Sequence, residues 1–225
     1  DSSGKPALTC ILAKHVDDIK ITGYRETVVW VLKKIEEQFG QLKIDWNNFT
    51  NCGVRHKQDT TTKEVTLDQD DYIKGIKLCV HADIRSAGSE TKACNELHAQ
   101  YWSVLGAIAY AVLTRPDIAV FVAALQRHSH EPCIIHVKRL NAVVRWAQRN
   151  PKAITFKQLS SANTPQGVAI PTHLREISDA AFKKEESTGH SMRGSCYLRC
   201  AGNTEAAASF EKGGHCEGEA TEWQR

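Results

Sequence analysis

The sequence predicts a mixed α/β protein of the α+β type, in which groups of strands and groups of helices follow one another along the chain. In the first third of the chain, apolar and polar residues alternate as they do in strands. In the middle, apolar residues recur at the three- and four-residue spacing of helices, and short alternating segments return near the end. A chain of 225 residues, 41% apolar and 24% charged, has enough apolar residues for a buried core.

Residues 7–23 predict two strands joined by a polar tight turn. The first strand keeps apolar residues on one face up to Leu12, and the alternation resumes at Ile19. The bend carries two adjacent carboxylates, Asp17 and Asp18. Two like charges side by side repel each other unless a cation or solvent separates them, so this turn suits a divalent metal. Taken alone, an Asp-Asp pair at a bend is usually an ordinary turn, and the chain has a second such pair at Asp70-Asp71.

A helix and a small sheet are predicted next. Residues 24–39 carry apolar side chains on one helical face, and Gly40 ends that helix. Residues 41–67 alternate again and predict a small antiparallel sheet, with a turn at 59–63. Asp68 is expected to cap a short helix that follows.

The second half of the chain predicts three helices, which span about 96–113, 117–130 and 133–149. The first is apolar on nearly all sides, Trp102 included, so we expect it to be buried. The break at Thr114-Arg115-Pro116 indicates a pair of buried helices rather than a membrane span.

Polar segments at 83–95 and 160–172 predict linkers, and two further strands are expected near 174–177 and 195–199. The segment after Ala201 has few apolar residues and is predicted to be poorly ordered.

Positive charge is concentrated in one part of the chain. The net charge is only +3, but residues 132–175 contain no acidic residue and seven Lys and Arg. On the third predicted helix, Lys138, Arg145 and Arg149 fall within about 40° of one another around the helix axis. Such a row could follow a phosphate backbone, although an ordinary solvated face has the same pattern.

Eight cysteines are scattered without the dense spacing of a small disulfide-bonded scaffold, and the polar N-terminus has no secretory signal pattern. These features favour reduced thiols and an intracellular location. Cys196 and Cys200, with His190 and the pair His215-Cys216, form an incomplete zinc pattern.

Several motifs occur in series. Val16-Asp17-Asp18 precedes Ile21-Thr22-Gly23, and later segments continue the series: VTLDQDDYI at 65–73, YWSVLG at 101–106, TRPDIA at 114–119, Ser178-Asp179-Ala180 and Ser187-Thr188-Gly189. In this order, the chain from about residue 7 to 199 resembles the C-terminal part of the reverse transcriptase of copia-type retrotransposons, running into its RNase H domain.

The resemblance implies that Asp17 and Asp18 are two of three polymerase carboxylates that bind Mg²⁺, with the third lying upstream. It implies that Asp179 is the first metal carboxylate of RNase H, whose later acidic partners have no recognisable counterpart here. The implied partners are an RNA or DNA template-primer and a deoxynucleotide, with no membrane. His15 departs from the family, which usually has tyrosine at this position.

The resemblance also implies an architecture: the hairpin and small sheet that end a polymerase palm, a helical thumb, and the start of an RNase H-like fold. The expected divisions are palm (1–80), linker (81–95), thumb and connection (96–158), linker (159–171), RNase H start (172–200) and tail (201–225).

Three functions stay open at this point. The chain is part of an active polymerase, a decayed inactive copy, or a non-enzymatic nucleic-acid-binding protein that uses the basic helix. For the 225 residues alone we predict no polymerase activity, because two carboxylates do not complete a two-metal site.

Overall fold

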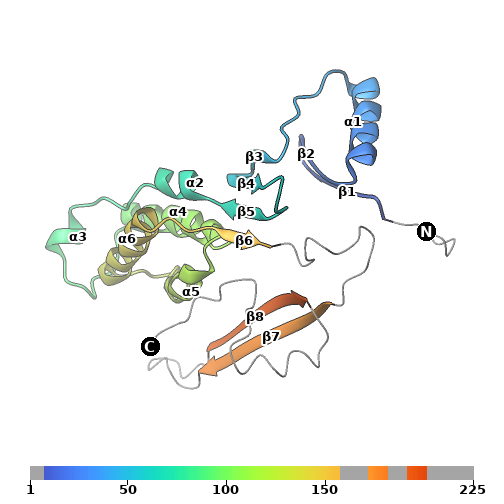
Figure 1. The fold of residues 1–225 in the computed structure, drawn as a ribbon. Coiled ribbons are helices and arrows are strands. Elements are labelled where there is room, and N and C mark those ends of the chain that lie inside the picture. Colours follow the sequence, from blue (N-terminus) through green and yellow to red (C-terminus); the bar gives the residue numbers. More distant parts are fainter. Residues whose placement is uncertain (1–7, 158–171, 182–191, 202–225) are drawn as a thin grey trace.

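The structure is a computed structural model that describes residues 8–157, 172–181 and 192–201 (Figure 1). Its described part is a mixed α/β arrangement with small antiparallel sheets and several helices, as the sequence predicts. No described helix is long and apolar enough to cross a membrane.

The first element is a two-stranded hairpin, called here the carboxylate hairpin. It consists of β1 (Cys10–His15) and β2 (Asp18–Gly23), which pair antiparallel. Helix α1 (Arg25–Phe39) follows and lies beside the hairpin in Figure 1. The helix ends at Gly40, whose φ of +86° suits glycine because the left-handed region excludes most side chains. Both predicted elements are confirmed.

A four-stranded antiparallel sheet comes next, in the order β3 (Asn48–Asn51), β4 (Val54–Gln58), β5 (Val65–Asp68) and β6 (Ile154–Phe156). The predicted turn before β5 is confirmed: Asp59 Oδ1 accepts the backbone N–H groups of Thr61 and Thr62, both at 2.7 Å.

Two features of this region differ from the prediction. Residues 41–46 lie outside the strands, although they alternate in polarity. One of them, Trp46, lies 5.1 Å from the guanidinium of Arg25, so a contact with α1 replaces sheet pairing. Strand β6 was not predicted, because a three-residue segment has too little periodicity to recognise and is selected by its partner β5.

Helices form the main core, and four of them with one 3₁₀ turn are called here the helical unit: α2 (Asp70–Gly75), α4 (Asn95–Ala111), η1 (Pro116–Ile118), α5 (Ala119–Gln126) and α6 (Ile134–Arg149). The three long predicted helices are confirmed. Their fully buried residues include Leu97, Ile108 and Leu140.

One expectation for α4 was wrong. Trp102 is 59% exposed, although the helix is apolar nearly all round. Its indole N–H donates to the carbonyl oxygen of Ser129, and its ring meets His98 edge-on. A tryptophan with a polar N–H is better placed at the rim of a core, where that group finds an acceptor.

The packing crosses the division expected near residues 81–95. Ile73 and Ile76 of the α2 region belong to the same core cluster as α4, α5 and α6, and β6 joins the sheet that precedes them. The expected linker also contains the one-turn helix α3 (Asp83–Ser86). The expectation that Asp68 caps α2 was wrong, because the N-cap residue is Gln69. Asp68 lies one residue earlier and accepts the Asp70 N–H at 3.3 Å.

The last described elements are β7 (Thr172–Ala181) and β8 (Met192–Ala201), which pair antiparallel over ten residues each. Both are longer than the predicted strands. The expected linker at 160–172 falls almost entirely outside the described residues, and the expected tail after Ala201 falls entirely outside them.

Candidate active site and nucleic-acid interface

The carboxylate hairpin closes with a two-residue turn, Val16-Asp17, and His15 pairs with Asp18 across it. Asp17 therefore lies in the turn itself, and Asp18 is the first residue of β2. Val16 has φ +52°, a left-handed conformation that two-residue hairpins need and that a β-branched residue rarely adopts. The backbone strain at such a position is on the order of 1 kcal/mol.

Asp18 is held by the neighbouring sheet. The side-chain amide of Asn51, the last residue of β3, donates to Asp18 Oδ2 at 3.2 Å. A second contact joins His15 Nδ1 and Cys52 Sγ at 3.4 Å. The tip of the carboxylate hairpin thus lies against the turn between β3 and β4, and both carboxylates are exposed to solvent.

The turn between β3 and β4 also contacts the helical unit. The Tyr110 hydroxyl of α4 donates to the carbonyl oxygen of Cys52, and Tyr110 meets Tyr72 of α2 edge-on at 5.3 Å between ring centroids. Gly53 has φ +72°, and a Cβ there would lie 3.4 Å from the Tyr72 ring. A continuous series of contacts therefore runs from Asp18 through this turn to the helical core.

A lysine and an aromatic pair form a second connection between hairpin and sheet. Lys20 Nζ lies 3.1 Å from His56 Nε2, and the His56 ring stacks on Phe49 with centroids 4.8 Å apart. Burial, together with the positive charge of Lys20, lowers the pKa of His56.

Asp17 and Asp18 fit a magnesium ion in kind but not in number. Carboxylate oxygens are the ligands that Mg²⁺ prefers, and it usually takes one or two of them together with waters and substrate phosphates. Among the described residues, the only cluster of three side chains able to bind a metal lies elsewhere, at His81, Asp83 and Cys94. The hairpin pair is therefore an incomplete site within the described part of the chain.

Asp179 lies in β7, opposite Gly194 of β8. The surroundings of its side chain fall outside what the structure describes, as do Ser187-Thr188-Gly189. Of the incomplete zinc pattern, Cys196 and Cys200 lie in β8, while His190 and His215-Cys216 are outside the described residues.

The TRPDIA segment (114–119) connects neighbouring helices through a buried arginine. Arg115 is fully buried and makes two hydrogen bonds to the Asp117 carboxylate, both at 2.9 Å. Its third nitrogen donates to the Ala147 carbonyl on α6 at 3.2 Å. Burial alone would raise the pKa of Asp117, but the hydrogen bond and charge of Arg115, with the charge of Lys152, hold that pKa below its ordinary value. This segment fastens α4 and η1 to α6.

Lys138, Arg145 and Arg149 are all exposed on α6, on the side that faces away from the core. No ion pair joins any of them to a carboxylate of the described residues. The opposite face of α6 is buried through Val137, Leu140, Val144 and Ala147, and it also carries the polar residue Asn141. The Asn141 amide bonds both the N–H and the carbonyl of Cys79, each at 2.9 Å.

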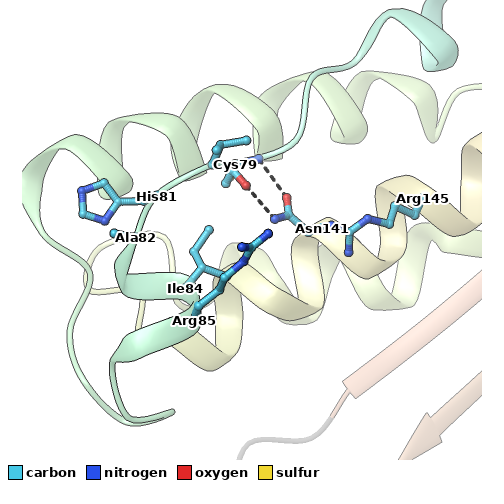
Figure 2. A pocket seen from close by; sticks show the side chains of 8 residues that line it. Cys79, His81, Ala82, Ile84, Arg85, Asn141 and Arg145 are labelled. Atoms are coloured by element: carbon cyan, nitrogen blue, oxygen red, sulfur yellow. Dashed lines mark hydrogen bonds between the residues drawn. The ribbon is translucent and has the colours of Figure 1, made fainter.

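A surface hollow of about 380 Å³ lies beside this helix (Figure 2). Arg85 of α3 and Arg145 of α6 both line it, together with Cys79 and Asn141, which are joined by hydrogen bonds. Arg85 was missed by the sequence interpretation, because it lies in the expected linker. Burial raises the pKa of Cys79 to about 11, so its thiol stays protonated near neutral pH and the positive charge of the hollow comes from the two arginines.

Comparison with protein-family models, with curated proteins and with solved structures found no match to this chain. The described residues form a mixed α/β structure that is compatible with the α+β class, whereas the resemblance to copia-type reverse transcriptases rests on the sequence motifs alone.

Proposed function

We propose that this chain is the C-terminal part of a retrotransposon reverse transcriptase that continues into RNase H, with Asp17 and Asp18 as two of its metal-binding carboxylates. The single observation that carries this proposal is the placement of both carboxylates at a tight two-strand turn, where Asn51 holds Asp18. A turn of this kind keeps two carboxylates together at the surface, where a divalent cation can reach both of them.

In the proposed enzyme, Asp17 and Asp18 would hold Mg²⁺ jointly with a carboxylate outside this chain. When bound, the ion supplies charge stabilisation for nucleotidyl transfer at the primer end. The contribution of this chain's own residues is positional. Asn51 fixes the orientation of Asp18, and the contacts of Cys52 with Tyr110 connect that position to the helical unit.

The remaining parts have corresponding proposed roles. The helical unit would serve as the thumb and connection, and β7 with β8 as the opening strands of the RNase H fold, with Asp179 as a metal carboxylate. The TRPDIA contacts support a structural role for that signature, because Arg115 is buried and unavailable to a template.

The test is primer extension on a primed RNA template by a longer protein that includes the segment encoded upstream. We expect Asp17→Asn and Asp18→Asn each to reduce Mg²⁺-dependent extension by on the order of 100-fold or more. Asp70→Asn is the matched control, because Asp70-Asp71 is also an Asp-Asp pair but begins helix α2. Equal activity of all three variants would contradict the proposed role of the hairpin.

Two further outcomes separate the alternatives. An inactive longer protein with an intact fold would identify a decayed copy. The 225-residue chain alone is expected to extend no primer, and Mg²⁺-dependent extension by it would contradict the view that its site is incomplete.

A second candidate, a non-enzymatic nucleic-acid-binding protein, is favoured by the exposed cations of α6 and their neighbour Arg85 across the hollow. Lys138→Ala combined with Arg145→Ala is expected to weaken duplex binding and reduce its salt dependence, by about one unit of slope for each lost phosphate contact. Asp17→Asn is the control and should leave binding unchanged. Binding that is insensitive to the α6 double variant would exclude this surface.

A further inference from the structure

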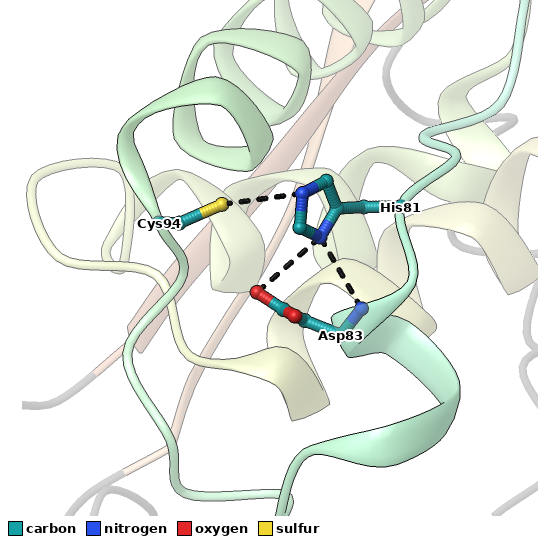
Figure 3. A group of neighbouring side chains, drawn as sticks. All are labelled: His81, Asp83 and Cys94. Carbon is teal, nitrogen blue, oxygen red and sulfur yellow. Dashed lines mark hydrogen bonds and ion pairs between the residues drawn. The ribbon is translucent and has the colours of Figure 1, made fainter.

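A second group of side chains of the kinds that bind metals lies at the N-terminal end of helix α4, away from the carboxylate hairpin (Figure 3). His81, Asp83 and Cys94 each place a possible ligand atom within 4.8 Å of the other two. His81 and Asp83 precede and begin α3, and Cys94 is the N-cap residue of α4. We propose that this group is a binding site for a divalent transition metal of the zinc class.

The spacing of the ligand atoms agrees with one tetrahedral ion. His81 Nε2 lies 3.6 Å from Cys94 Sγ. Around a tetrahedral zinc ion, with bonds of about 2.0 Å to nitrogen and about 2.3 Å to sulfur, those two ligand atoms lie about 3.5 Å apart. In this arrangement His81 and Cys94 are the direct ligands. Glu96 Oε2, in the first turn of α4, lies 3.9 Å from the same nitrogen and is the nearest further carboxylate on that side of the ring.

Asp83 orients the histidine. Its Oδ2 lies 3.3 Å from His81 Nδ1, on the opposite side of the ring from Cys94. The Asp83 backbone N–H also points at Nδ1, at 3.2 Å, so the ring tautomer is set by which of the two contacts is used. Metal binding selects the tautomer that donates its Nδ1 proton to the carboxylate and leaves the Nε2 lone pair for the ion. A carboxylate behind a metal-bound histidine is a common supporting arrangement.

The charges around the ring favour a cation. Asp83 and Glu96 both approach His81, and neither makes an ion pair with a lysine or arginine of the described residues. Both carboxylates bring negative charge to the ring, and that charge favours a divalent ion bound by His81 and the Cys94 thiolate. Soft sulfur together with imidazole selects zinc-class ions over Mg²⁺, which prefers oxygen ligands only.

The loop that carries the site is already held in place without metal. The Ala93 N–H donates to the Pro132 carbonyl at 2.8 Å, and the Ile134 N–H donates to the Thr91 carbonyl at 2.9 Å. These bonds fix the chain immediately before Cys94 against the start of α6. A bound ion would close the segment from His81 to Cys94 and stabilise the packing of α3 on the helical unit.

The test is a titration of the chelator-treated full chain with Co²⁺, which reports a thiolate ligand through sulfur-to-metal charge-transfer absorption and a tetrahedral site through intense visible bands. The wild-type protein is expected to bind one equivalent with both signals. Cys94→Ser should abolish the charge-transfer band and weaken binding at least tenfold. Serine is a favoured N-cap residue, so this variant keeps α4 intact.

Cys52→Ser is the matched control, because Cys52 also contacts a histidine nitrogen, at 3.4 Å from His15, without a third ligand nearby among the described residues. It should titrate like the wild type. Asp83→Asn should weaken binding by roughly 10- to 100-fold while keeping the band, as expected of an orienting residue. In parallel, Zn²⁺ should raise the unfolding temperature of the wild type and not that of Cys94→Ser. Identical titrations of wild type and Cys94→Ser, or loss of the band in Cys52→Ser instead, would overturn the proposal.

Discussion

The carboxylate hairpin and the helical unit of the same chain differ in how far their apolar side chains are exposed to solvent. In the hairpin, Ile11 is 55% exposed and Leu12 44% exposed, whereas Leu97, Ile108 and Leu140 of the helical unit are fully buried. A lone two-stranded hairpin has too little surface to bury either of its faces. The proposed functional carboxylates, Asp17 and Asp18, therefore lie on a weakly packed element. The TRPDIA segment (114–119) belongs to a strongly packed one.

The largest expected effect tests the packed side of this comparison. Arg115→Ala leaves the Asp117 carboxylate without its main partner and removes the contact to Ala147, so the free energy of unfolding should fall by about 3–5 kcal/mol. Urea denaturation followed by circular dichroism measures it. Arg149→Ala, an exposed arginine on the same helical unit, should change stability by less than about 0.5 kcal/mol. Equal effects of the two variants would contradict the structural role assigned to Arg115.

The second prediction compares the two regions directly. Leu140→Ala removes a fully buried side chain and should cost about 2–5 kcal/mol of unfolding free energy. Leu12→Ala makes the same chemical change on the hairpin and should cost no more than about 0.5 kcal/mol. A large cost for Leu12→Ala would contradict the weak packing of the hairpin.

A third variant addresses the strain at the hairpin turn. Val16→Gly should stabilise the hairpin by about 1 kcal/mol, because glycine adopts positive φ without steric cost and the Val16 side chain, 72% exposed, contributes little packing. Hydrogen exchange of the β1 and β2 amides reports this local change. Val80→Gly is the control at an exposed valine without positive φ, where glycine should give no such protection. Faster exchange in Val16→Gly would argue against strain at this turn.

The smallest expected effect is the dependence of stability on pH. Burial lowers the pKa of both His56 and His136, so near their ordinary value of 6.5 the folded protein binds fewer protons than the unfolded chain. Stability is therefore complete above that pH and falls as the pH decreases through the lowered values. The lowered pKa of Asp117 adds a further loss below its ordinary value of 3.8.

Urea midpoints measured from pH 7.5 to pH 3 follow these changes. His136→Gln, in the helical unit, should reduce the change of the urea midpoint with pH near pH 6.5. His56→Gln, in the sheet beside the hairpin, should also reduce it. A stability that rises on acidification through pH 6 has the opposite sign and would contradict both assignments.

Local sequence pattern was sufficient for the α+β class, the hairpin with Asp17 and Asp18 at its bend, and the long helices with Lys138, Arg145 and Arg149 on an exposed face. These features follow from the period of the apolar residues and from turn chemistry, which act between neighbours in the chain. Strand β6, the exposure of Trp102 and the burial of Arg115 were decided only by the tertiary structure. Each depends on a partner far away in sequence: β5, Ser129 and Ala147, respectively.

The same distinction applies to the sites. The sequence by itself singled out the adjacent carboxylates, because they are neighbours in the chain. Only folding showed that Asn51 holds Asp18, that Arg85 faces the same hollow as Arg145, and that His81, Asp83 and Cys94 meet. The physical reason is that side-chain contacts act over a few ångströms in space, and a sequence specifies which distant residues come that close only through the packing of the whole chain.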